Sequence, residues 1–74
     1  MDPQATWQAM LDAYAESDWI AAPEHAEALI GWLDRGGFPP ETVEGRELRP
    51  ELNRAIAIAA SRLVLEKAER GGIP

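Results

Sequence analysis

The stretch Trp32-Leu33-Asp34-Arg35-Gly36-Gly37-Phe38-Pro39-Pro40 contains the strongest local structural signals in the chain. Glycine takes the left-handed backbone conformation without a Cβ clash, so we expect one of the two glycines to close a helix here. Phe38 is then placed to fold back onto the last turn of the helix, near Leu33 and Trp32, as the apolar contact of the cap. The two prolines prevent the helix from resuming, because proline lacks an N–H group and restricts the residue before it. The stretch therefore predicts the end of a helix and the start of an irregular connection.

The residues before this stretch predict two helices joined by a short turn. Asp2 is a favourable N-cap and Pro3 a favourable first residue, and the apolar residues that follow recur with helical spacing, so we predict a helix over residues 3–16. A turn over residues 19–21 leads into a second predicted helix over 22–35. Helices joined by so short a connection pack as an antiparallel hairpin.

The connection after the second helix, residues 36–49, is unusually long for a compact domain. We expect it to be an ordered strap that Phe38, Val43 and Leu48 attach to the body of the protein. Residues 40–44 are compatible with a single helical turn, which the following glycine would end. Pro50 then begins a long third helix over residues 50–70.

The predicted third helix is apolar on more than one side. Its main stripe, which we assign to the core, consists of Leu52, Ala55, Ile56, Ala59 and Leu63. Ile58 and Leu65 project to nearly the opposite side, and Val64 lies in a third sector. A helix of this kind is normally buried from several directions, and a hairpin with a strap covers one of them. We therefore expect a second copy of the chain, or a different partner, on that face, and we assign Ile58, Val64, Leu65 and the neighbouring Arg62 to a self-interface.

Together these elements predict an all-α fold. Residues 1–74 form one small three-helix domain, built from a helical hairpin, a long ordered strap and a long C-terminal helix. The predicted core consists of Trp7, Met10, Leu11, Tyr14, Trp19, Ala26, Leu29, Trp32, Leu33, Phe38, Leu52, Ile56, Ala59 and Leu63.

The composition of the 74 residues argues against several kinds of chemistry. There is no cysteine and His25 is the only histidine, so we expect no metal site, no cofactor and no enzymatic activity. No apolar run is long enough to cross a membrane, and the first residues lack a signal-peptide pattern. We therefore expect a cytoplasmic protein.

Charge is distributed unevenly along the chain. Residues 1–34 contain seven acidic residues and no Lys or Arg, whereas residues 35–74 contain seven basic and six acidic residues. The net charge is therefore −7 for residues 1–34 and +1 for residues 35–74, which together give −6. This distribution favours basic partners over phosphate backbones. The long connection also exceeds that of a helix-turn-helix, so we do not expect direct binding to nucleic acid.

The leading functional hypothesis is a protein–protein interaction module that forms a homodimer through its C-terminal helix. The alternative is a small acidic inhibitor or nucleic-acid mimic that binds a basic protein surface through the first hairpin. Its contact would be an acidic face that consists of Asp12, Glu16, Asp18, Glu24 and Glu27. A further candidate is the strap, where Phe38, Pro39 and Pro40 would form an exposed knuckle for a partner.

Overall fold

The computed structural model describes residues 1–71 and contains three helices in that part of the chain. They are α1 (Pro3–Ala15), α2 (Ala21–Asp34) and α3 (Pro50–Gly71), and no strand occurs among the described residues. The all-α three-helix prediction is confirmed, and each predicted helix boundary agrees to within one residue. The last three residues of the predicted domain, 72–74, lie outside the described part.

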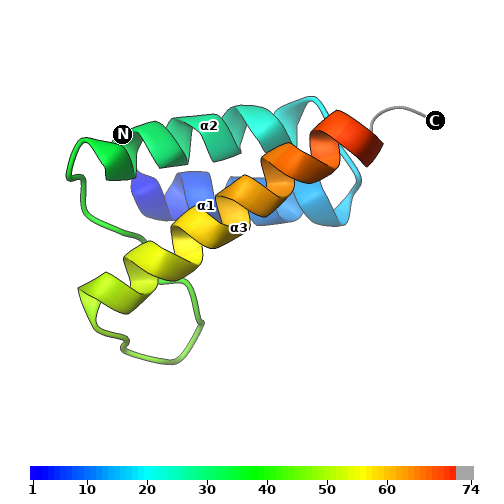
Figure 1. The fold of residues 1–74 in the computed structure, drawn as a ribbon. Helices are drawn as coiled ribbons and strands as arrows, with labels where there is room; N and C mark the ends of the chain where they lie inside the picture. The colour runs from blue at the N-terminus through cyan, green and yellow to red at the C-terminus, as the bar shows by residue number, and fades with distance from the viewer. Residues whose placement is uncertain (72–74) are drawn as a thin grey trace.

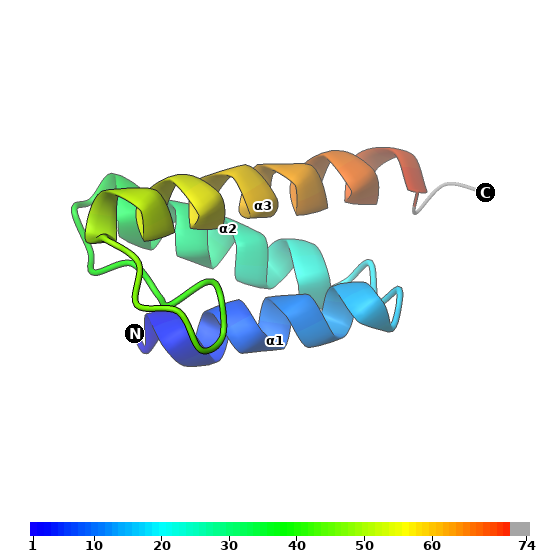
Figure 2. The same cartoon turned by 90° about the horizontal axis from the view of Figure 1, so that it is seen from below.

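The second helix lies between the other two in the packing. α1 and α2 form the predicted antiparallel hairpin, and α3 runs back along α2 at an angle (Figures 1 and 2). The main helix contacts are those of α2 with α1 and of α2 with α3. The strap joins the end of α2 to the start of α3 and passes close to the beginning of α1 (Figure 2).

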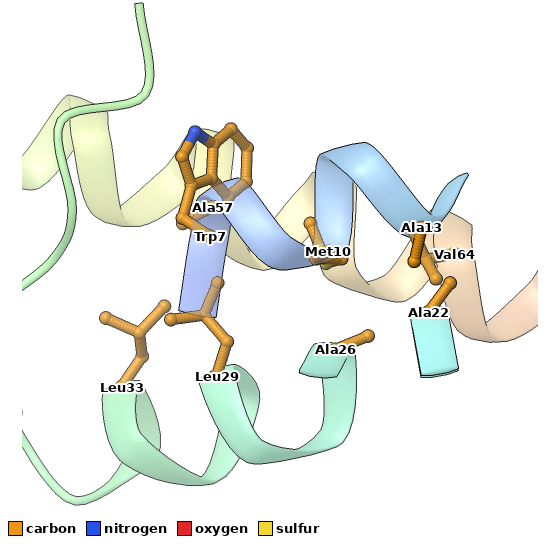
Figure 3. Close-up of a cluster of buried hydrophobic side chains, with 9 residues drawn as sticks. All are labelled: Trp7, Met10, Ala13, Ala22, Ala26, Leu29, Leu33, Ala57 and Val64. Carbon is orange, nitrogen blue, oxygen red and sulfur yellow. The ribbon is translucent and has the colours of Figure 1, made fainter. Parts of the chain in front are cut away.

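The core is built on the inner faces of α1 and α2, with a smaller contribution from α3. Met10, Leu29 and Leu33 are the largest hydrophobic side chains that are fully buried. The whole buried cluster, drawn in Figure 3, consists of Trp7, Met10, Ala13, Ala22, Ala26, Leu29, Leu33, Ala57 and Val64. Small residues on the inner face of α2 allow α1 and α3 to approach closely.

The two helices of the hairpin, α1 and α2, end with the same backbone arrangement. At the end of α1, Ser17 has a φ of 56°, and the Asp18 N–H donates to the Ala13 carbonyl at 2.8 Å. The Asp18 side chain then accepts hydrogen bonds from the N–H groups of Ile20 and Ala21, which caps the start of α2. The turn is therefore fixed by backbone geometry and by one carboxylate.

The end of α2 confirms the predicted glycine cap. Gly36 has a φ of 83°, and the Gly37 N–H donates to the Trp32 carbonyl at 2.9 Å. The predicted apolar contact of Phe38 is wrong, because that side chain is 78% exposed. Instead the Phe38 carbonyl accepts a hydrogen bond from Trp32 Nε1 at 2.8 Å. The Trp32 ring lies so close to Gly37 that a Cβ atom at this position would clash with it.

The strap is ordered, but the reason differs from the one predicted from its apolar residues. Val43 is 41% exposed, and residues 40–44 form no helical turn. The strap is held by hydrogen bonds instead. Gln4 exchanges two with the backbone of Glu41, at 3.1 and 2.8 Å. Asn53 Oδ1 accepts one from the N–H of Thr42 and one from its hydroxyl, at 3.1 and 2.9 Å.

Five residues of the predicted core are exposed. Leu11 is 38% exposed, Leu52 47% and Leu63 48%, while Phe38 and Ala59 are also open to solvent. On α3 the error is a rotation of the helix about its axis. Asn53 binds the strap, and Arg54 donates to the Leu33 carbonyl at 2.6 Å and to the Gly37 carbonyl at 3.1 Å. These two polar side chains turn Ala57 and Val64 inward and leave the predicted stripe outside.

Candidate protein interface on α3

An apolar stripe runs along the exposed side of α3. We define the α3 stripe as Leu52, Ile56, Ala59 and Leu63, which are four, three and four residues apart and so lie on one side of the helix. Leu52 and Leu63 are each about half exposed, Ala59 is exposed and Ile56 is half-buried. This is the spacing by which helices pack on other helices.

The packed side of α3 has the opposite character. Its buried residues are Asn53, Ala57, Ser61 and Val64, two of which are polar. The Ser61 hydroxyl donates to Met10 Sδ at 3.6 Å, so even this buried polar group has a partner. α3 thus buries mainly small and polar side chains and leaves its two half-exposed leucines, Leu52 and Leu63, outside.

The structure corrects the predicted self-interface. Val64 is only 4% exposed and belongs to the core, while Ile58 and Leu65 are half-buried and pack against it. Leu65 lines an open depression together with Pro23 and Glu27 of α2, so part of this face remains accessible. Ile58 and Leu65 are therefore partly covered within the single chain, and their contact with a second copy stays a prediction. Arg62 is exposed, as that prediction required.

The C-terminal end of the α3 stripe is charged. Leu63 lines a shallow, open depression of about 210 Å³ together with Glu66, Lys67 and Arg70. Arg70 pairs with Glu66 at 3.1 Å. Within residues 1–71 the other ion pair is Arg49 with Glu51, so Lys67 has no carboxylate partner in the described part of the chain.

The predicted acidic face gathers at one end of the molecule. Its residues lie at the end of α1, in the turn and in the first half of α2, which the antiparallel hairpin brings together (Figure 2). All five side chains are exposed, and none takes part in an ion pair within residues 1–71. Asp18 differs from the others because its carboxylate caps α2.

The predicted knuckle of the strap is only partly available to a partner. Phe38 is exposed and Pro39 half-buried, but Pro40 is buried. Phe38 and Pro39 line one side of a shallow groove of about 290 Å³ with Leu48 and Pro50. The structure therefore shows an exposed phenylalanine whose carbonyl is bonded to Trp32, beside a buried Pro40 that is not part of the exposed surface.

Two further findings describe the part of the chain that the structure covers. No group of three His, Cys, Asp or Glu side chains among residues 1–71 is arranged to hold a metal ion. None of the three helices described is long and apolar enough to cross a membrane.

Comparison with known proteins found no family model, no curated protein and no solved structure that matches this chain.

Sequence reasoning found the α3 stripe but gave it the wrong role. The spacing of Leu52, Ile56 and Leu63 is equally compatible with a core face and with an external contact face. The adjacent residues Asn53 and Arg54 separate the two possibilities. Their polar groups need hydrogen-bond partners when they are buried, so they indicate which face of α3 packs on the hairpin. Two adjacent polar residues that begin a long apolar helix are a usable indication of its inward side.

Proposed function

We propose that this chain is a non-enzymatic protein–protein interaction module that forms a homodimer through the α3 stripe. The observation that carries the proposal is the inversion of α3, which buries Ala57 and Ser61 and exposes Leu52 and Leu63. The C-terminal helix remains the self-associating element, as expected from the sequence, but the contact lies on the side of the helix that carries the α3 stripe.

The energetics of a small domain support this assignment. Few large side chains are fully buried in the single chain, and a domain of this size is commonly stabilised by oligomerisation. Burying the exposed half of a leucine contributes roughly 1 kcal/mol. An interface related by two-fold symmetry uses each of the stripe leucines twice, which multiplies this contribution.

The test is the mass of the protein in solution, measured by light scattering over a roughly tenfold concentration range at low and high salt. We expect the mass of two chains for the natural sequence and of one chain for Leu63→Glu. The variant should keep its helix content, because position 63 is exposed in the single chain and Lys67, four residues later, attracts the introduced carboxylate.

The matched control is Ile20→Glu, which introduces the same charge at an 80% exposed isoleucine in the turn before α2. This variant should retain the dimer mass. A natural sequence that stays monomeric throughout the concentration range would overturn the proposal, as would a Leu63→Glu variant that remains dimeric.

A second candidate function is supported by the unpaired acidic face. Asp12, Glu16, Glu24 and Glu27 are exposed, and within residues 1–71 no basic side chain neutralises them. Such a surface suits a small acidic inhibitor, or a nucleic-acid mimic, that binds a basic protein. Salt separates the two functions, since binding through this face should weaken steeply with ionic strength and an apolar self-interface should weaken far less.

A further inference from the structure

We infer that the two copies meet with their α3 helices antiparallel, so that Leu52 of one copy packs on Leu63 of the other. This inference rests on the proposed homodimer and specifies its geometry. Three properties of the described chain lead to it, namely the sizes of the stripe residues, the charges at the two ends of α3 and the direction of the helix dipole.

The sizes of the stripe residues fit an antiparallel pair. With the two-fold axis between Ile56 and Ala59, each Ile56 lies opposite Ala59 of the second copy, and Leu52 lies opposite Leu63. Every layer then combines side chains whose sizes are complementary or equal. A parallel pair would place Ile56 against Ile56 and Ala59 against Ala59, which leaves one crowded layer and one gap.

The charges favour the same orientation. The C-terminal segment 62–70 contains three basic and two acidic residues, whereas segment 44–51, which leads into α3, contains three acidic and two basic residues. In the antiparallel register the C-terminal end of each α3, which carries Lys67, lies at the N-terminal end of the other α3, which the strap residue Glu47 precedes in the sequence. Lys67 has no ion pair within residues 1–71, and Glu47 is exposed.

The helix dipoles also favour the antiparallel orientation. Antiparallel α3 helices bring the positive N-terminal end of each beside the negative C-terminal end of the other. A parallel arrangement would bring like ends together, and it would also place the positively charged C-terminal segments side by side. Each of these contributions is modest, and all of them favour the antiparallel pair.

Disulfide trapping tests the orientation directly, because the natural chain contains no cysteine. The single variants Leu52→Cys and Leu63→Cys are prepared, and each is oxidised alone and after mixing in equal amounts. We expect a cross-linked dimer in the mixture, with peptide mapping that joins position 52 to position 63. Each variant alone should give only the background of Glu24→Cys, an exposed position on α2.

The outcomes separate this inference from the proposed function. If the reduced variants have the mass of a dimer but each cross-links with itself, the antiparallel geometry is overturned and the α3 homodimer stands. If the reduced proteins are dimers but no mixture cross-links above the background, the stripe is not the contact, and both the antiparallel inference and the assignment of the homodimer to the α3 stripe fail. If the natural chain is monomeric, the proposed function itself fails before any variant is oxidised.

Discussion

The two faces of α3 differ in a way that reverses the usual expectation. One face carries Asn53, Ala57, Ser61 and Val64 and is buried, whereas the other carries the exposed Leu52, Ala59 and Leu63, with the half-buried Ile56 packing against the core at its edge. A ranking by hydrophobicity would exchange them. Two factors determine which face of α3 is packed. The small side chains allow α3 to approach the hairpin closely, and Asn53 and Arg54 form hydrogen bonds on that side. The hydrophobicity of a helix face therefore does not by itself identify the inner side.

The largest expected effect comes from placing a charge on the packed face. Ala57 is fully buried, so Ala57→Asp would place a carboxylate in the core at a cost of more than about 3 kcal/mol. This is comparable to the whole stability of a domain of this size. We expect circular dichroism to show a largely unfolded chain.

The same substitution two positions further along the helix is the matched control. Ala59 is exposed, so Ala59→Asp should remain folded and should appear as a monomer. If the two variants were equally unfolded, or if Ala57→Asp melted like the natural chain, the assignment of the two faces would be refuted.

A smaller effect is expected at Arg54, which sets the rotation of α3. Arg54→Ala removes two hydrogen bonds from a charged donor to the carbonyls of Leu33 and Gly37, so unfolding by urea should show a loss of roughly 2 kcal/mol. Arg62→Ala is the comparison, since Arg62 is exposed and makes no ion pair in the described chain. Equal losses for the two variants would show that Arg54 contributes no more than a surface arginine.

The smallest expected effect concerns the hold of α3 on the strap. Asn53→Ala removes the acceptor of two hydrogen bonds from Thr42, and we expect a loss of roughly 1 kcal/mol in urea unfolding. An Asn53→Ala variant that is as stable as the natural chain would contradict the role of Asn53 as an acceptor.

The sequence was informative wherever structure depends on neighbouring residues. The Asp2 cap, the glycine cap at Gly36 and the inner faces of α1 and α2 all follow from short-range rules. The rotation of α3 and the path of the strap depend on hydrogen bonds between distant residues, such as Gln4 with Glu41 and Arg54 with Leu33. The periodicity of the apolar residues contains no information about such pairs. It therefore located the apolar stripe of α3 but predicted that this stripe faces the core.

The clamp that Arg54 forms on the end of α2 has a consequence for the order of events during synthesis. No basic residue occupies the last turn of α2, and the arginine that binds its Leu33 carbonyl follows 21 residues later. On a ribosome, the hairpin leaves the exit tunnel while the last carbonyl groups of α2 are held only by the local glycine cap, in which the Gly36 and Gly37 N–H groups donate to Leu33 and Trp32. The C-terminal turn of α2 therefore gains the additional hold of Arg54 only when the first turns of α3 have left the tunnel and have docked.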